Sequence, residues 1–517
     1  MKTKKLLLAV VFGSFLFSCS NNEQFEFDNG ANEQDQMALT VSETLSLNEG
    51  RGEEVPEADV IKIAQEYIED INENSLSAKK ASGFVTRATK TTPKMSISKK
   101  YYLNDTQEAT RGLSSNVKAT VYDVDVTNED GTKGLVVVGG DDRYPKVIAY
   151  IPRFEMSEKN AHLKTTSRLK NSQENLMLGL SKAVYRKKIV QISDAQAKKT
   201  ETLEKIAKGL NISSTDVDSD ALNEYISKYG IVESSIENDM TDEMTRSSSM
   251  PEPGSKVIRS YGRPCGVLWD QWEPYNLMYD EDWVDIFFGS CSYTHHPAGC
   301  AVVAIAQIMA ALEPAGMKCC GQNIDWAYLK EKEVINSGPF GEIDEQRKIN
   351  MVAALFRDIY NKTKSYPTWG TGDSDEWPPQ KVNCVTQTGT NSSNVYDYFK
   401  NLSTVTVINY NTSGVIKWDP EVIRQSLQYS FPVFVGGNGH AFVLDEFLCC
   451  IKSLTRTLIK QYDVYFHANF GWGADDAATG YYLVQDTVNG TITFETSQGN
   501  YVDSEMSILP FIGKKTL

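Results

Sequence analysis

The sequence predicts an α+β protein in which a small unit of one helix and an antiparallel sheet precedes a larger, two-lobed C-terminal unit. Three observations support this prediction. The chain has 517 residues, too many for one typical core. A helical pattern followed by apolar runs of strand length occupies residues 56–155. All eight tryptophans and eight of the nine cysteines lie at or after Cys265, so the composition changes sharply between the two units.

The composition is that of an ordinary globular protein. Hydrophobic residues make up 41% of the chain and charged residues 23%, which argues against disordered and fibrous classes. The formal net charge is −16 at pH 7. A polyanion would be repelled by this charge at long range, and we therefore expect no nucleic-acid partner.

Residues 1–19 have the pattern of a bacterial lipoprotein signal peptide. A lysine-rich start precedes an apolar run from Leu6 to Phe17, which is shorter than the roughly 20 residues that a membrane-spanning helix needs. The run ends in Leu16-Phe17-Ser18-Cys19, which resembles a lipobox, where the cysteine is acylated. We expect an exported protein anchored to the membrane through Cys19, at the cell surface or the periplasmic face. An ordinary secretory signal with an incidental cysteine is the alternative.

Residues 20–55 are polar and acidic with little periodicity, and we expect a linker there. From Pro56 to Ile71, apolar residues recur three and four positions apart, which predicts an amphipathic helix. Strands are predicted between residues 117 and 150, where apolar runs are separated by turn residues. The helix and the strands would form one self-contained unit over residues 56–155.

Residues 156–250 are rich in charged and small polar residues, with weak helical periodicity at 176–189 and 203–210. We expect solvated helices or a loosely packed spacer. The segment from Arg246 to Gly254 contains three serines, two prolines and a glycine. It therefore predicts an unstructured boundary and a good protease target, followed by the C-terminal unit over residues 251–517.

Cys300 has the local sequence of a nucleophilic cysteine. Thiol catalysis requires a thiolate, a histidine that exchanges protons with it, and a group that orients the imidazole. Cys300 follows Pro297-Ala298-Gly299 and begins an alanine-rich apolar run. This pattern predicts a buried helix with the cysteine at its N-terminus, where free N–H groups and the helix dipole favour the thiolate. A structural cysteine at the start of a core helix is the alternative.

His440 and Asn469 are the candidates for the other two groups. His440 lies between glycines and a predicted strand, 140 residues after Cys300 (440 − 300), a separation typical of papain-like enzymes. Asn469 ends a predicted strand 29 residues later (469 − 440), before Phe470-Gly471-Trp472-Gly473. Its side-chain carbonyl can accept the imidazole N–H and fix the tautomer. Taken singly, the histidine fits a core position and the asparagine a turn.

These segments together resemble the streptopain-like cysteine peptidases. The resemblance extends over about residues 56–155 and 255–500, and leaves residues 156–245 unmatched. The segments that carry it are Gln271 with Pro274-Tyr275-Asn276, Gly299-Cys300 with Ala304–Met309, Gly439–Val443, His467–Gly473, and, in the N-terminal unit, Gly134–Val138, Asp142–Pro145 and Ala149-Tyr150.

The resemblance implies a two-lobed papain-like peptidase, preceded by an inhibitory α+β prodomain over residues 56–155. A helical lobe would carry Cys300, and an antiparallel sheet lobe would carry His440 and Asn469. Cys300 would attack the peptide carbonyl and His440 would transfer the proton. Gln271 and the Cys300 N–H would stabilise the oxyanion.

The resemblance also implies that Asn469 and Trp472 support the catalytic histidine. The family usually has a tryptophan directly after the asparagine, and this chain has Phe470. Phenylalanine keeps the hydrophobic cover but lacks the indole N–H, so we expect weaker support of His440.

The function implied by the resemblance is a secreted or surface cysteine endopeptidase that is made as an autoinhibited zymogen and hydrolyses proteins or peptides. The family prefers a hydrophobic residue second before the cut bond. Cleavage near Arg246–Arg259 would release the mature enzyme from its own prodomain. Two alternatives stay open: acyl transfer to an amine, as in transglutaminase-like enzymes, and a catalytically silent surface protein that uses the fold for binding.

Beside Cys19 and Cys300, seven cysteines remain (9 − 2), an odd number that disulfides cannot use completely. Export makes some pairing plausible, but the sequence does not give the partners. Cys291, His295, His296 and Cys300 are spaced like metal ligands. Because the C-x-x-C pairs of structural zinc sites are missing, we expect no metal and no other cofactor.

Overall fold

In the computed structural model of the chain, the predicted α+β class is confirmed. The structure describes residues 37–81, 93–103, 117–154, 175–232, 256–287, 289–338, 343–407, 414–437, 439–453, 459–473, 478–485, 491–496 and 499–514. The predicted signal peptide, its Cys19 and the segment from Arg246 to Ser255 lie outside these residues. Among the described residues, none of the helices is both long and apolar enough to cross a membrane.

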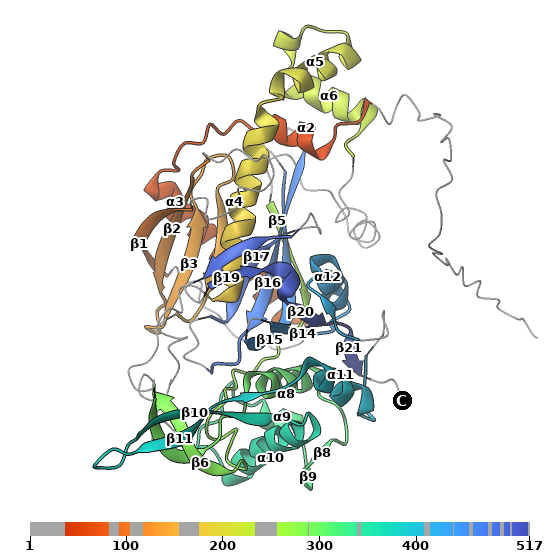
Figure 1. The fold of residues 1–517 in the computed structure, drawn as a ribbon. Coiled ribbons are helices and arrows are strands. Elements are labelled where there is room, and N and C mark those ends of the chain that lie inside the picture. The colour runs from red at the N-terminus through yellow and green to blue at the C-terminus, as the bar shows by residue number, and fades with distance from the viewer. Residues whose placement is uncertain are drawn as a thin grey trace, which may run out of the picture.

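The N-terminal unit consists of one long helix and a four-stranded antiparallel meander (Figure 1). The apolar face of helix α3 packs on the sheet through Val60, Ala64 and Ile68, as its periodicity predicts. The elements are α3 (Glu57–Ala81), β1 (Lys94–Leu103), β2 (Ala119–Thr127), β3 (Lys133–Gly139) and β4 (Lys146–Ile151).

The sheet of this unit continues into the C-terminal unit, because β4 pairs antiparallel with β17. The described residues form one eleven-stranded sheet in the order β1-β2-β3-β4-β17-β16-β15-β14-β20-β13, and β5 also pairs with β15. The C-terminal strands are β5 (Lys256–Gly262), β13 (Ile416–Lys417), β14 (Val433–Gly437), β15 (His440–Ser453), β16 (Lys460–Asn469), β17 (Gly480–Val484) and β20 (Ser507–Leu509), accompanied by α12 (Pro420–Gln428).

A helical lobe covers one face of strands β14 and β15. Its central helix, α8 (Cys300–Leu312), is buried along nearly its whole length because its residues are alanine, valine, isoleucine and methionine. The remaining elements of this lobe and of the chain end are α9 (Trp326–Leu329), α10 (Gln346–Lys362), α11 (Ser392–Asn401), the two-stranded ribbons β8 (Lys318–Cys319) with β9 (Gln322–Asn323), β12 (Val405–Val407) with β21 (Ile512–Lys514), β18 (Thr493–Thr496) with β19 (Gly499–Val502), and the 3-10 turn η3 (Asp503–Glu505).

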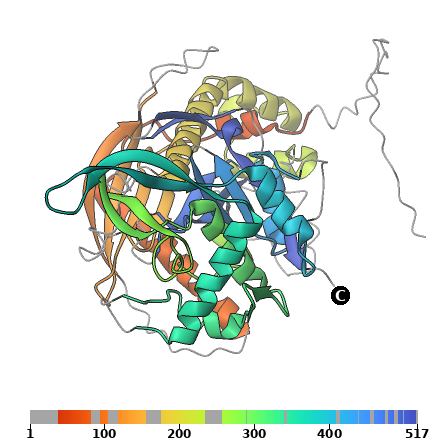
Figure 2. The same cartoon turned by 60° about the horizontal axis from the view of Figure 1, so that its bottom comes forward.

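Beside the helical lobe lies a small closed barrel of two hairpins, which the sequence patterns did not indicate. A disulfide joins Cys291 to Cys384 across it. The second hairpin projects beyond the rest of the molecule (Figures 1 and 2). The barrel strands are β6 (Glu281–Phe287), β7 (Ser290–His295), β10 (Tyr366–Ser374) and β11 (Lys381–Gly389).

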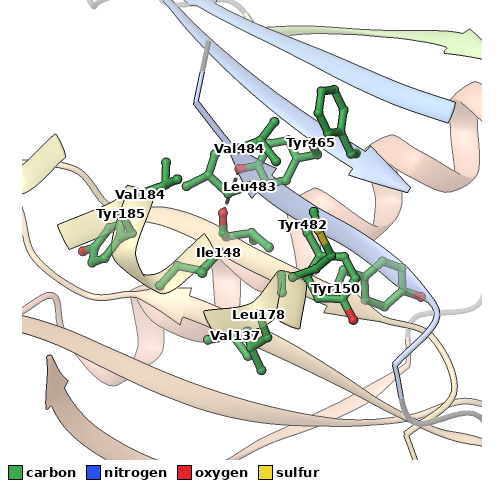
Figure 3. Packing of buried hydrophobic residues seen from close by; sticks show 14 of the residues in the cluster. Val137, Ile148, Tyr150, Leu178, Val184, Tyr185, Tyr465, Tyr482, Leu483 and Val484 are labelled. Atoms are coloured by element: carbon green, nitrogen blue, oxygen red, sulfur yellow. Dashed lines mark hydrogen bonds between the residues drawn. The ribbon is translucent and has the colours of Figure 1, made fainter. Parts of the chain in front are cut away.

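The expectation of a loosely packed spacer is wrong for helix α4 (Leu176–Gln196). Its residues Leu178, Tyr185 and Ile189 are almost completely buried in the core that the N-terminal sheet shares with the C-terminal sheet. Figure 3 shows Leu178, Val184 and Tyr185 packed beside residues of both sheets. The weak periodicity has a physical cause: α4 packs against β4, β17 and β18, so apolar residues occupy more than one side of it.

A second helical group completes the segment before β5. Helices α5 (Lys199–Leu210) and α6 (Ser219–Tyr229) enclose a small core with Leu39. The expected linker over residues 20–55 is described from residue 37 onward, where it forms α2 (Val41–Ser46) instead of an irregular tether. This helix begins with a capping box at Thr40. The 3-10 turn η2 (Ser214–Asp216) connects α5 to α6.

Candidate active site

Cys300 is the first residue of helix α8, as the sequence predicts. Gly299 precedes it with φ of 93°, and a Cβ at this glycine would lie 2.9 Å from Thr388 Cγ2. The glycine therefore meets two requirements, a left-handed backbone and a close approach to strand β11. The Thr388 hydroxyl also donates to the Pro297 carbonyl at 2.6 Å. These contacts fix the turn that presents the half-buried Cys300.

Gln271 lies close to this turn. Its backbone carbonyl accepts a hydrogen bond from the Ala298 N–H at 2.9 Å, two residues before Cys300. The buried Asn276 side chain donates to the carbonyls of His295 and His296 at 3.3 and 3.0 Å. Two segments whose contacting residues lie 19 to 27 positions apart in sequence are thus held against each other, and the backbone of Gln271 is brought to the nucleophile loop.

His440 is the first residue of strand β15, opposite the helix that carries Cys300. Its Nε2 lies 3.1 Å from the Phe470 carbonyl oxygen. A carbonyl oxygen can only accept, so this contact places a hydrogen on Nε2. In the neutral imidazole, Nδ1 is then the basic nitrogen that can take up a proton.

Asn469 lies at the end of strand β16, but it does not hold His440 in the way the sequence suggests. Its carboxamide oxygen accepts hydrogen bonds from Gln307 Nε2 at 2.8 Å and from the Gly471 N–H at 3.1 Å. Its Nδ2 donates to the Val267 carbonyl at 2.9 Å. Both oxygen lone pairs are used, so the acceptor for the imidazole is the Phe470 carbonyl. Asn469 shapes the loop that provides this carbonyl.

Aromatic rings surround the imidazole. The centroid of the His440 ring lies 4.9 Å from that of Trp472, and the ring stacks nearly parallel to Phe470 at 5.8 Å. Phe470 is buried and stacks on Phe442 at 4.7 Å. The substitution of phenylalanine for the family tryptophan therefore keeps the apolar cover. The hydrogen bond to His440 comes from the backbone carbonyl of residue 470 and does not depend on the side chain there. Weaker support of His440 by phenylalanine stays a prediction.

The aromatic loop is tied directly to the helix of Cys300. Gly471 has φ of 70°, and a Cβ there would lie 2.7 Å from Val303 Cγ1 on helix α8. Gln307, which is completely buried on the same helix, donates to Asn469. Helix α8 also packs against strand β15, which begins at His440. Helix α8, which begins at Cys300, therefore contacts the strand or loop that carries each candidate residue of the sheet lobe.

Other cysteines that the structure describes are poor candidates for the nucleophile. Burial raises the pKa of the Cys265 and Cys319 thiols well above the ordinary value, and it raises the pKa of Cys449 to about 12. Such thiols stay protonated at neutral pH and are poor nucleophiles. The disulfide uses Cys291, so this residue is not available to the metal-ligand pattern considered above.

A further pair of polar residues escaped the sequence analysis. His467 Nδ1 lies 2.6 Å from the Oδ1 of the buried Asp445. Both line a pocket of about 250 Å³ that Asn469 and Gly473 also border, with Arg153 of the N-terminal unit in its wall. His467, two residues before Asn469, was the sequence feature that could have indicated this pair. Its partner Asp445 lies 22 residues away in sequence, on the neighbouring strand.

Three comparisons with known proteins were made. Residues 269–482 match the model of the Peptidase C10 family. Among solved structures, the chain is similar to a fragment of prointerpain A from Prevotella intermedia that carries a cysteine-to-alanine mutation. The identity is 14% over 81% of this chain and 100% of that chain, with a TM-score of 0.36. No curated protein matches the chain.

Proposed function

We propose that the chain, whose residues 269–482 match the model of the Peptidase C10 family, is the precursor of a Cys-His endopeptidase acting on proteins or peptides. The observation that supports the mechanism best is the contact between His440 Nε2 and the Phe470 carbonyl. It leaves Nδ1 as the basic nitrogen, and the helix of Cys300 holds the loop that makes the contact.

In the proposed mechanism, the proton of the Cys300 thiol passes to Nδ1 of His440, and the resulting thiolate attacks the substrate carbonyl. The Cys300 N–H and the Gln271 side chain donate to the oxyanion. His440 then protonates the leaving amine, and water hydrolyses the thioester with His440 as the base. Trp472 and Phe470 keep water away from the Nε2 hydrogen bond, and Asn469 acts as a positioning residue.

We also propose that the N-terminal unit inhibits the peptidase until it is removed. Strand β4 pairs with β17, next to the strand that ends at Asn469. Arg153 forms an ion pair with Glu333 of the C-terminal unit at 3.0 Å, and both line the pocket beside Asn469. The position of β5 narrows the expected cleavage region of Arg246–Arg259. Because residues 256–262 are paired with β15, we propose cleavage before Lys256.

Export with a lipid on Cys19 remains a proposal that rests on the sequence of residues 1–19. Release of a soluble mature enzyme from that anchor would follow from cleavage before Lys256. Mass spectrometry of the membrane-bound precursor tests it directly, since an acylated N-terminal cysteine would be absent from a Cys19→Ala variant.

Self-processing of residues 20–517 in a mild reductant tests the peptidase function. We expect the wild type to produce a fragment of about 30 kDa, the share of the 57.7-kDa chain that follows residue 250, and to cleave casein. Cys300→Ala should do neither. Cys320→Ala is the matched control, because Cys320 is an exposed cysteine whose pKa is raised by partial burial.

The same samples separate the alternatives. Processing that persists in Cys300→Ala would contradict the assigned nucleophile. Incorporation of a labelled amine without net proteolysis would instead indicate acyl transfer. A trimmed wild type, prepared with an added protease, that cleaves neither casein nor short peptides would favour the silent binding protein.

A further inference from the structure

The hairpin of β10 and β11 carries an exposed tryptophan at its tip. Trp377 is 91% exposed, the largest exposed fraction among the described large hydrophobic residues. The hairpin extends away from the domain in both views (Figures 1 and 2). A single exposed hydrophobic residue is ordinary in soluble proteins, so its significance depends on what else the hairpin carries.

The hairpin is held rigidly at its outer half. Disulfide Cys291–Cys384 joins it to strand β7. A Cβ at Gly372 would lie 2.4 Å from Cys291 Sγ, so the two strands are in close contact there. Backbone hydrogen bonds from Asp373 to Gly289 and from Asp375 to Cys291, at 2.6 and 2.9 Å, continue this attachment to the tip. Trp377 is therefore presented on a fixed arm, which lowers the entropic cost of using it for binding.

The inner end of the same hairpin lies at the candidate active site. Trp369, which is 46% exposed, packs its ring edge-on to His296 at 6.2 Å, four residues before Cys300. Residues 369, 371 and 373 alternate onto one face of β10, and all three are exposed. Strand β10 covers five residue steps from Trp369 to Ser374 (374 − 369), roughly 17 Å at about 3.3 Å per residue, and Trp377 follows in the turn. An extended polypeptide of about five residues has the same length as this part of the strand.

The barrel that bears this hairpin is strongly acidic. Over residues 281–295 and 366–389 it has six carboxylates and one lysine, a net charge of −5 (1 − 6) with histidine neutral. Three carboxylates, those of Asp373, Asp375 and Glu376, lie within four residues of Trp377 and are exposed. Lys381 is the one positively charged residue of these two ranges, and it forms an ion pair with Asp373 at 3.0 Å.

We propose that this hairpin is an arm that binds a lysine- or arginine-rich segment of a polypeptide substrate, while another segment of that substrate occupies the site at Cys300. The inference rests on the proposed peptidase function. An ammonium or guanidinium group is attracted to the face of an indole, and the neighbouring carboxylates add charge complementarity. The same carboxylates disfavour docking on an anionic lipid surface.

Binding is measured with the full precursor carrying Cys300→Ala, so that no cleavage occurs. The probe is a fluorescent unstructured peptide of about 15 residues rich in lysine and arginine. We expect the additional change Trp377→Ala to weaken its affinity about three- to fivefold, the size of an exposed cation–π contact, and Glu376→Gln to weaken it about twofold. Tyr429→Ala, which removes an aromatic residue of 68% exposure elsewhere, should leave it unchanged.

Kinetics on the processed enzyme complete the test. Trp377→Ala should raise the KM for a basic protein about threefold and leave the hydrolysis of a four-residue peptide unchanged. An equal loss on the short peptide, or no loss on either substrate, would overturn the proposal. So would Trp377-dependent binding of a neutral oligosaccharide or of phosphatidylserine vesicles in place of the basic peptide. An enzyme that cleaves nothing refutes the proposed function. The peptide-binding assay still tests whether the hairpin binds basic peptides.

Discussion

The C-terminal sheet has two large interfaces, and their chemistry differs. Toward the N-terminal unit, an apolar core that includes Val137, Ile148, Leu483 and Val484 also contains hydrogen bonds and ion pairs of tyrosines and charged groups. The Tyr465 hydroxyl donates to the Val147 carbonyl at 2.8 Å, and Asn175 donates to the Tyr482 hydroxyl at 2.7 Å. Lys146 pairs with the buried Asp463 at 2.5 Å, and Tyr144 donates to the same carboxylate.

Toward the helical lobe, the contacts are aliphatic. Val302 and Val303 of helix α8 share a core with Phe434 and Val443 of the sheet, and all four are almost completely buried. The hydrogen bond between Gln307 and Asn469, which shapes the aromatic loop, is one of the polar contacts on this side.

The difference separates an interface suited to opening from one suited to staying closed. A tyrosine contributes apolar area when buried and keeps a hydroxyl that water can satisfy when exposed. A valine surface that loses its partner only exposes apolar area to water. Water could therefore satisfy the tyrosine hydroxyls and charged groups of this junction after separation, in agreement with the proposal that the N-terminal unit is removed.

The largest effect expected from this comparison is on the helical-lobe side. Phe434→Ala should destabilise the precursor and the processed enzyme alike, by about 3–5 kcal/mol, because it opens a cavity in a core that both forms share. Urea denaturation of both forms, monitored by tryptophan fluorescence, measures it. A loss confined to the precursor would contradict the assignment of Phe434 to the permanent interface.

A somewhat smaller effect is expected at the junction. Lys146→Ala leaves the buried Asp463 carboxylate without its cation, which should destabilise the precursor by about 3 kcal/mol. The processed enzyme lacks residue 146, so the prediction concerns the precursor, which should self-process faster. Lys62→Ala is the control, because Lys62 forms only an exposed pair with Glu66 in the same unit. Equal processing rates in the two variants would contradict the predicted role of the Lys146–Asp463 pair in holding the junction closed.

The smallest effect concerns pH. Burial raises the pKa of the Glu446 carboxyl above its ordinary value of 4.5, and the hydrogen bond from Ser260 and the charge of His467 offset only part of this rise. Glu446 also accepts a hydrogen bond from Tyr481 on the tyrosine-rich side. The folded protein therefore binds this proton more tightly than the unfolded chain. That stabilisation is complete below pH 4.5 and is lost as the pH rises through the raised pKa.

Glu446→Gln should consequently raise the stability at pH 7.5, and the gain should vanish near pH 4. Thermal unfolding at the two pH values measures it. A gain that is equal at both values would refute titration of Glu446 as the cause. Asp445 and His467, which face the same carboxylate, are present in both proteins, so the difference between the two curves isolates Glu446.

Local patterns were sufficient for the elements that present the candidate residues. The start of α8 at Cys300, the start of β15 at His440 and the end of β16 at Asn469 all follow from glycines and apolar runs within about ten residues. Helix α3 follows from its periodicity in the same way. Each of these features depends on residues that are close to one another in the sequence, so it can be predicted from the sequence alone.

Contacts between distant residues could not be predicted. The disulfide joins cysteines 93 residues apart, and Asn469 binds Gln307 and Val267, which are 162 and 202 residues away. The aromatic–glycine loop indicated a site but not that the Phe470 carbonyl would accept the imidazole N–H, because any residue carries a carbonyl. Helix α4 was misjudged because a helix buried on several sides lacks the one-sided stripe by which amphipathic helices are predicted.

The pairing of β4 with β17 has a consequence for the life of the protein after processing. In the order of the sheet, β17 lies between β16 and β4 alone. Loss of the N-terminal unit would turn this strand into an open edge with unpaired N–H and C=O groups, a known template for association between chains. In the precursor, the N-terminal unit therefore covers an edge on which copies of the chain could otherwise associate.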